Sequence, residues 1–254
     1  MKAYVYKKYG SPEEIKCIER DIPSPKKNEL LIKVKAIGLN PLDYRIRRGS
    51  LSPWTNLHFP RQIGSDFSGE VVEIGSPDSS FKIGDQVYGM VFQLLSGASA
   101  EYLVVKENYL FYAPKSLKLE EAAAVPLAAQ TSLQALRDIG QLKKGMRVLI
   151  NGASGGVGTF AIGLSKIFEA HITAVTSFRN TSLVTELGAD EVIDYTKNDF
   201  TKWNQTFDII FDCWGNKNFN IVQKNLTENG LYISTIPNSK NFLFSLKTSL
   251  SSKK

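Results

Sequence analysis

The chain has 254 residues, a formal net charge of +6 and a hydrophobic content of 43%. This length favours two domains with a sizeable core, because a single domain usually has roughly 100 to 200 residues. No apolar run approaches the eighteen or so residues of a transmembrane span, and residues 1–10 lack the apolar stretch of a signal peptide. Two cysteines without a pairing motif fit a reducing compartment. We therefore expect a protein of the cytoplasm.

The positive charge is concentrated at the end of the chain. The last fifteen residues hold no acidic residue and four lysines, Lys240, Lys247, Lys253 and Lys254. A nucleic-acid or membrane surface needs a basic face with interleaved aromatic residues or a longer amphipathic helix. A short lysine-bearing tail is usually just solvated. We expect neither nucleic acid nor a membrane as a partner.

Residues 1–122 have the pattern of a small all-β domain. Short alternating runs are separated by segments rich in Gly, Pro, Asn and Asp. Strands are expected at 2–7, 30–36, 69–74, 86–90 and 102–105. Between residues 122 and 130 a helix is expected to begin and to lead into the second domain. Pro126 belongs near its start, because proline is tolerated in the first helical turn.

The phrase NGASGGVG at 151–158 separates a β-branched run, 147–150, from a helical pattern over 156–168. Its glycines therefore lie on a strand-to-helix turn. A helix N-terminus offers unpaired N–H groups and a partial positive charge, and glycine lets a pyrophosphate approach closely. The spacing Gly152, Gly155, Gly158 differs from the GxGxxG fingerprint, so a tight turn without a ligand is the alternative.

Strands and helices continue to alternate after this turn. Further strands are expected at 172–176, 191–195, 207–213 and 231–236, with helices at 181–187 and 216–226. This order is typical of βαβ units, so we predict an α/β fold in which 123–254 form a doubly wound parallel (Rossmann) sheet. Five strands are expected where such a sheet usually has six.

The end of the second strand of this sheet indicates which nicotinamide cofactor the chain prefers. An NAD site usually has an Asp or Glu there for the ribose 2′-hydroxyl. Here Ser177 and Arg179 follow the strand, and both can hydrogen-bond a 2′-phosphate. NADPH is therefore the expected cofactor. A solvated Arg179 at the start of a helix is the alternative.

Several further phrases occur in a characteristic order: GLNPLDYRIRRG at 38–49, IGSDFSGEVVEIG at 63–75, FKIGDQVYGM at 81–90, PLAAQTSLQAL at 126–136 and LGADEVIDY at 187–195. With NGASGGVG, they resemble the zinc-independent quinone oxidoreductases of the medium-chain dehydrogenase/reductase superfamily, closest to the reticulon-4-interacting-protein-like NADPH reductases. The resemblance implies a GroES-like substrate and catalytic domain over 1–122 and a Rossmann NADP-binding domain over 123–254. It also implies a C-terminally truncated fold, without the family's sixth strand and return segment.

A metal is not expected. A catalytic zinc site needs three protein ligands, mostly Cys and His, and this chain has only Cys17, Cys213, His58 and His171, without a CxxC or HxxxH motif. Zinc-dependent relatives carry a Cys and a Gly-His-Glu where this chain reads NPLD at 40–43 and GSD at 64–66.

The resemblance implies hydride transfer from NADPH to a quinone or an α,β-unsaturated carbonyl, in which charge collects on an enolate that hydrogen-bond donors hold. In the family the segment 40–44 faces the nicotinamide, so the Asn40 amide and the Tyr44 hydroxyl are the candidate catalytic groups. The alternative is structural: Asn40 builds a turn before Pro41, and Tyr44 packs.

The resemblance assigns the other cofactor contacts residue by residue. They are Thr131 at the nicotinamide, Ser154, Gly155, Gly156 and Val157 at the pyrophosphate, Ser177 and Tyr195 at the adenosine end, and Gly215 after the fourth strand. Two other functions stay open, an NADPH-binding sensor or remnant with weak catalysis and an enoyl-thioester reductase. The natural substrate, the proton donor and the oligomeric state, a homodimer among the options, are not readable from the sequence.

Overall fold

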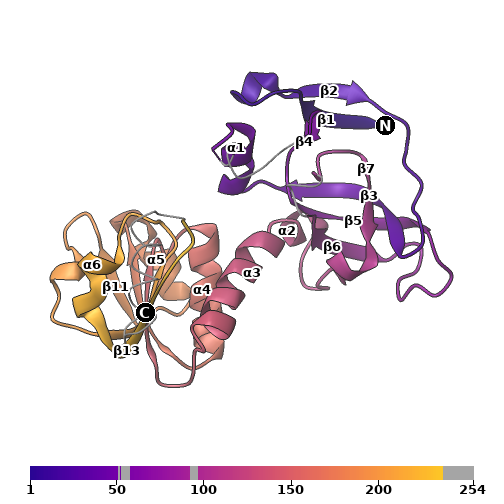
Figure 1. The fold of residues 1–254 in the computed structure, drawn as a ribbon. Helices are drawn as coiled ribbons and strands as arrows, with labels where there is room; N and C mark the ends of the chain where they lie inside the picture. The colour runs from indigo at the N-terminus through magenta and orange to yellow at the C-terminus, as the bar shows by residue number, and fades with distance from the viewer. Residues whose placement is uncertain (51, 53–57, 92–96, 237–254) are drawn as a thin grey trace. The chain divides into compact units, whose positions relative to one another are not determined.

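The computed structural model describes residues 1–50, 52, 58–91 and 97–236, and the lysine-bearing segment 237–254 lies outside them. The chain forms two compact units, Met1–Leu127 and Ala128–Lys254 (Figure 1). The first is built mainly from antiparallel strands, and the second has the alternating strands and helices expected from the sequence.

Two antiparallel sheets form the first unit. The smaller has the order β2-β1-β4, with β1 at Lys2–Tyr6, β2 at Lys16–Glu19 and β4 at Arg61–Gln62. The larger has the order β7-β3-β5-β6-β8, with β3 at Glu29–Gly38, β5 at Asp66–Ile74, β6 at Gln86–Met90, β7 at Tyr102–Lys106 and β8 at Leu110–Tyr112. Its core includes Leu30, Ile32, Phe67, Val71 and Val87. The predicted β domain is confirmed, and the five strands expected from the sequence correspond to β1, β3, β5, β6 and β7.

Three short helices belong to the ends of these strands. Helix α1 (Pro41–Arg47) follows β3, while α2 (Leu119–Ala122) and α3 (Pro126–Leu133) follow β8. Gly38 pairs with Asp66 in the β3–β5 ladder, and a Cβ at Gly38 would lie 2.4 Å from the Ala123 carbonyl oxygen. A glycine at this position therefore lets the end of α2 approach the end of β3. Helix α3 begins at Pro126, as predicted.

The second unit has a five-stranded parallel sheet with the order β11-β10-β9-β12-β13. Its strands are β9 (Arg147–Asn151), β10 (His171–Thr176), β11 (Glu191–Asp194), β12 (Phe207–Asp212) and β13 (Leu226–Ser234). Helices α4 (Gly156–Ile167), α5 (Thr181–Glu186) and α6 (Phe219–Val222) connect them. This is the doubly wound arrangement predicted from the sequence.

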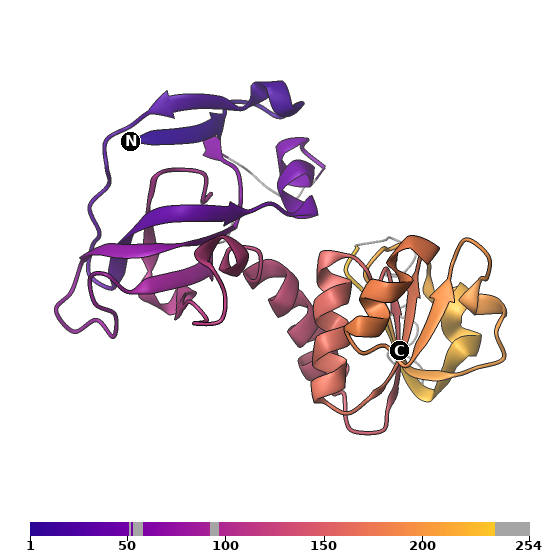
Figure 2. The same cartoon turned by 180° about the vertical axis from the view of Figure 1, so that it is seen from behind.

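Both faces of this sheet are buried, which explains its nearly continuous apolar strands. Val148 and Ile150 of β9 pack in a cluster with Ile162 of α4. Leu149 points to the opposite face and packs in a second cluster with Phe219 of α6. Helices lie on both sides of the strands (Figure 2). Because alternate residues of β9 enter different cores, a shift of the strand register by one residue would exchange the two faces.

The structure differs from the sequence prediction between residues 216 and 231. The expected helix over 216–226 is reduced to α6 and a 3₁₀ turn at Gln223–Asn225, and β13 begins at Leu226 rather than at 231. Asn225 ends the helical segment, because its buried amide donates to the carbonyl oxygens of Trp203 and Gln205. The β12–β13 register then shifts between the pairs Phe207–Leu226 and Ile209–Leu231, and the polar residues 227–230 lie in this irregular stretch of β13.

Across the parts of the chain that are described, no helix combines the length and the apolar character needed to cross a membrane.

Candidate functional site

The parallel sheet has a topological switch point beside β9. From β9 the chain moves to β10 on one side and returns later to β12 on the other side. In open α/β sheets, ligands bind at such a point, outside the carboxyl ends of the strands. Asn151 ends β9 and Asp212 ends β12, and the two are paired in the ladder. The turn 152–158 therefore lies where a dinucleotide is expected.

This turn has the shape that a phosphate needs. Gly152 has a φ of +83°, which favours glycine. A Cβ at Gly158 would lie 2.3 Å from the Gly152 carbonyl oxygen, so the first turn of α4 packs directly on the loop. Gly155 and Gly156 are exposed, and a Cβ at Gly156 would meet only the Ala128 Cβ, at 3.8 Å. The N-terminus of a twelve-residue helix is thus left open by residues without side chains, which fits a pyrophosphate.

Val157 and Thr131 lie on the helices that border this turn. The Val157 carbonyl oxygen accepts a hydrogen bond of 2.7 Å from the Ser132 hydroxyl, which also bonds the Ala128 carbonyl oxygen. Thr131 precedes Ser132 on α3 and is partly exposed. The Ser132 bonds therefore fix the segment that carries Thr131 against the start of α4.

Asp212 organises the loop that follows β12. Its side chain is fully buried and accepts hydrogen bonds from the Asn151 amide at 2.8 Å, from the Gly215 backbone at 2.8 Å and from the Tyr232 hydroxyl at 2.9 Å. Gly215 has a φ of +77°, which suits a residue without Cβ. These bonds place Gly215 beside the end of β9.

Ser154 belongs to a small network at the end of β10. Its oxygen accepts from the Thr176 hydroxyl at 2.8 Å and from the Asn180 amide at 3.0 Å. Both bonds use Ser154 as an acceptor, so its own hydrogen remains for an acceptor such as a phosphate oxygen. The network thereby fixes Ser154 near the residues that follow β10.

The expected adenosine end combines charge and aromatic surface. Ser177 and Arg179 follow β10 directly, and Arg179 is exposed. The Tyr195 backbone N–H donates to the Thr176 carbonyl oxygen, which places the exposed Tyr195 at the same edge of the sheet. The Lys197 Nζ lies 5.4 Å from the centroid of the Phe178 ring. A site for an anionic ribose phosphate would find two cations here.

The two candidate catalytic groups lie at the start of α1 and within it, in the first unit. Asn40 precedes the helix, and its amide nitrogen donates to Asp66 Oδ2 at 3.0 Å. Its backbone N–H donates to Asp43 Oδ2 at 2.6 Å. Tyr44 is 43% exposed, and the Arg48 guanidinium carbon lies 5.4 Å from the centroid of its ring. The phenol of Tyr44 is thus accessible and lies beside a positive charge.

Asp66 is the titratable group that contacts Asn40. It is fully buried at the start of β5 and also accepts from the Leu127 backbone N–H, at 3.2 Å and 3.1 Å to its two oxygens. The pKa of Asp66 is raised to about 6, mainly by burial and to a smaller extent by the charge of Asp43, while the hydrogen bonds from Asn40 and Leu127 act in the opposite direction. Its protonation state therefore changes near neutral pH.

Sequence reasoning missed Asp66, Thr176, Asn180 and Asp212 as parts of these networks. One signal was present for Asp212, a carboxylate that ends an otherwise apolar run, FDIIFDC. The expected cofactor residues from Thr131 to Gly215 all lie in the second unit, while Asn40 and Tyr44 lie in the first.

Among the described residues, no group of three His, Cys, Asp or Glu side chains is arranged to hold a metal ion. Cys17 and Cys213 are free thiols. Burial, with the nearby charge of Asp212, raises the pKa of Cys213. Cys213 is therefore a neutral thiol near pH 7.

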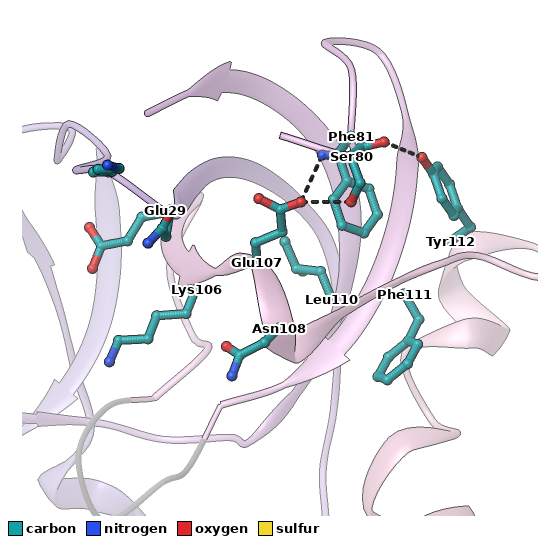
Figure 3. Close-up of a pocket in the computed structure, with 11 residues that line it drawn as sticks. Glu29, Ser80, Phe81, Lys106, Glu107, Asn108, Leu110, Phe111 and Tyr112 are labelled. Carbon is teal, nitrogen blue, oxygen red and sulfur yellow. Dashed lines mark hydrogen bonds between the residues drawn. The ribbon is translucent and has the colours of Figure 1, made fainter. Parts of the chain in front are cut away.

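The first unit also has a groove of about 890 Å³ (Figure 3). On one side, Glu107 accepts from the Ser80 backbone and hydroxyl, and the Tyr112 hydroxyl donates to the Ser80 carbonyl oxygen. These bonds fasten the turn around Ser80 to β8. None of the residues expected to bind cofactor or substrate lines this groove.

Comparison with known proteins identifies both units. Residues 26–115 match the Alcohol dehydrogenase GroES-like domain family, and residues 156–237 match the Zinc-binding dehydrogenase family. The chain is 36% identical to the Chloroplast envelope quinone oxidoreductase homolog of Arabidopsis thaliana, over 93% of this chain and 75% of the relative. It is 39% identical to the mitochondrial NAD(P)H oxidoreductase RTN4IP1 of Bos taurus, over 85% of this chain and 60% of the relative.

A solved structure, the quinone oxidoreductase from Coxiella burnetii, superposes with a TM-score of 0.86 at 32% identity, over 100% of this chain and 81% of that one. A GroES-like β unit followed in sequence by a parallel nucleotide-binding sheet defines a medium-chain dehydrogenase/reductase. Within that class, the chain belongs to the quinone oxidoreductase family. The resemblance seen in the sequence is confirmed. The chain spans less than two thirds of some relatives, for example 61% of the Spinacia oleracea homolog.

Proposed function

We propose that this protein is an NADPH-dependent oxidoreductase that works without zinc and transfers hydride to a quinone or an α,β-unsaturated carbonyl. The observation that carries the proposal is the turn 152–158, with two exposed glycines at the N-terminus of α4 beside the switch point. In this proposal residues 123–254 bind the cofactor, and residues 1–122 hold the substrate and the catalytic groups.

Each cofactor contact uses a group at the carboxyl edge of the sheet. The first N–H groups of α4, at Gly156 and Val157, have no partner within the helix and bind the pyrophosphate together with Gly155 and Ser154. Ser177 and Arg179 bind the 2′-phosphate, and Tyr195 covers the adenosine. Thr131 and Gly215 lie at the nicotinamide end. NADPH, when bound, supplies the hydride.

Helix α1 and the residues at its two ends act on the substrate. When hydride adds to the carbon remote from the carbonyl, negative charge collects on the substrate oxygen. The Tyr44 hydroxyl donates a hydrogen bond to that oxygen, and the Arg48 guanidinium beside the ring keeps a positive charge near it. The Asn40 amide orients the reacting groups. Because the positions of the zinc ligands are occupied by residues of NPLD and GSD, the Tyr44 hydroxyl and the Arg48 charge replace a Lewis acid.

The phenol of Tyr44 gives a direct test of this role. We expect Tyr44→Phe to lower kcat about tenfold, because a hydrogen bond to a charged group contributes about 1.5 kcal/mol. The affinity for NADPH should stay unchanged. Tyr4→Phe is the matched control, since Tyr4 is an exposed tyrosine of the same unit on β1. Equal kcat values for Tyr44→Phe and the wild type would remove Tyr44 from the mechanism.

The function itself is tested by NADPH oxidation at 340 nm in the presence of EDTA, with an ortho-quinone, an enone and an enoyl thioester, and by NADPH binding measured in parallel. Turnover of the quinone or enone supports the proposal. Tight binding without turnover indicates an NADPH sensor, and turnover of the thioester alone indicates an enoyl-thioester reductase. A location in the cytoplasm and a homodimer stay predictions.

A further inference from the structure

We propose that Asp66 is a positioning residue that controls the orientation of the Asn40 amide. Its carboxylate holds the nitrogen end of the amide, so that the oxygen end is presented to a ligand as a hydrogen-bond acceptor. Protonation of Asp66 removes this constraint. The part of this inference that concerns turnover rests on the function proposed above, whereas the orientation of the amide does not.

The argument begins with the chemistry of the two side chains. An ionised carboxylate only accepts hydrogen bonds, whereas a primary amide has a donor end and an acceptor end. Asp66 Oδ2 lies 3.0 Å from the Asn40 amide nitrogen. While Asp66 is ionised, only the nitrogen of Asn40 can face it. A protonated Asp66 can also donate, so the amide can turn and direct its oxygen to Asp66.

The surroundings of Asp66 leave the Asn40 amide as its side-chain hydrogen-bond partner. The carboxyl group is fully buried, and its other hydrogen bonds come from the Leu127 backbone N–H. Its partners in the neighbouring strands, Gly38 of β3 and Met90 of β6, carry no charge. The charged group that acts on it is Asp43 of α1, which has the same sign. Among the described residues no cation holds the carboxylate ionised, and burial sets its protonation near pH 6.

Asn40 is held at its other end as well. Its backbone N–H donates to Asp43, and its carbonyl oxygen accepts from the Asp43 N–H. The backbone is therefore fixed at the start of α1, and rotation of the side-chain amide is the freedom that remains. This freedom decides whether a ligand meets an acceptor or a donor, and Asp66 removes it above about pH 6.

The first test needs neither cofactor nor turnover. The side-chain amide signals of Asn40 are assigned in ¹⁵N NMR spectra of the wild type by their loss in Asn40→Ala. We expect these signals to titrate with a midpoint near pH 6 and to become independent of pH in Asp66→Asn. Asp78→Asn, which changes an exposed carboxyl of the same unit, should titrate like the wild type. Signals that do not move in the wild type, or that still titrate in Asp66→Asn, would overturn the proposal.

The second test measures kcat/KM against pH with the quinone substrate. The wild type should lose activity as the pH falls through about 6. Asp66→Asn mimics the protonated side chain, so we expect it to have, at all pH values, the low kcat/KM that the wild type has in acid, about tenfold below the wild type at pH 7.5. In the Asn40→Ala background the same substitution should change kcat/KM less than about twofold.

The combination separates the possible roles. Additive effects of the two substitutions would mean that Asp66 only fixes the first turn of α3 through Leu127, and would overturn the positioning role. A wild type in which the Asn40 signals titrate while no substrate is turned over would overturn the proposed function alone. Because the wild-type titration needs no variant of Asp66, a failure of Asp66→Asn to fold does not remove the test.

Discussion

Gly158→Ala is expected to destabilise the protein by about 2 kcal/mol, although alanine is normally the better helix former. The added Cβ would lie 2.3 Å from the Gly152 carbonyl oxygen and 2.7 Å from two backbone atoms of Ala153. Backbone cannot move aside as a flexible side chain can, so α4 has to shift away from the turn. Thermal unfolding followed by circular dichroism should show a Tm lower by roughly 4–8 °C.

The same helix offers a matched control. Apart from the backbone of α4 itself, a Cβ at Gly163 would meet no atom of the described residues within 4 Å, so Gly163→Ala gains helix propensity without a clash and should stabilise by about 0.5–1 kcal/mol. The two substitutions add the same methyl group to α4 and should act in opposite directions. A Gly158→Ala variant with the wild-type Tm would show that the turn does not pack as closely as described.

The sequence was sufficient for most of the fold, because its patterns are local. A β-branched run followed by closely spaced glycines and a 3.6-residue period predicts β9, the turn and α4 without information from elsewhere in the chain. Strand β2, Lys16–Glu19, was missed, because none of its side chains is fully buried and its sequence, KCIE, has no apolar alternation. The early start of β13 was missed because it depends on the pairing of Leu226 with Phe207.

The candidate site likewise has features made by adjacent residues, which the sequence predicts, and contacts between distant residues, which it does not. The glycine turn and the residues after β10 were predicted, since adjacent residues create them. The contact of Asn40 with Asp66 joins residues 26 positions apart, and that of Leu127 with Asp66 joins residues 61 positions apart. The first contact follows from the antiparallel register of β3 and β5, and the second from the placement of the start of α3 against β5. A single sequence specifies neither. In the sequence, Asp66 was noticed only as the last residue of GSD, the stretch that stands where zinc-dependent relatives carry Gly-His-Glu. That comparison gave no indication of its contact with Asn40.

The residue after Phe178 should decide the choice between the two nicotinamide cofactors. We expect Arg179→Ala to raise the Kd for NADPH about tenfold to a hundredfold, because a hydrogen bond between charged groups contributes about 1.5–3 kcal/mol. The Kd for NADH should hardly change, since NADH has no 2′-phosphate. Trp214 is 68% exposed and lies beside Gly152, so energy transfer from tryptophan to bound NADPH can report binding without turnover.

Two further variants make this test specific. Lys143→Ala removes the same charge at an exposed position before β9, at the opposite end of the sheet, and should leave both Kd values unchanged. Lys197, which lies over the Phe178 ring, supplies a second cation. Any preference for NADPH over NADH that remains in Arg179→Ala should therefore decrease in the double variant Arg179→Ala/Lys197→Ala. If Arg179→Ala raises the Kd values for NADPH and NADH equally, Arg179 only attracts the cofactor by its charge and does not recognise the 2′-phosphate. The absence of a carboxylate after β10 would then leave the preference for NADPH without a residue that creates it.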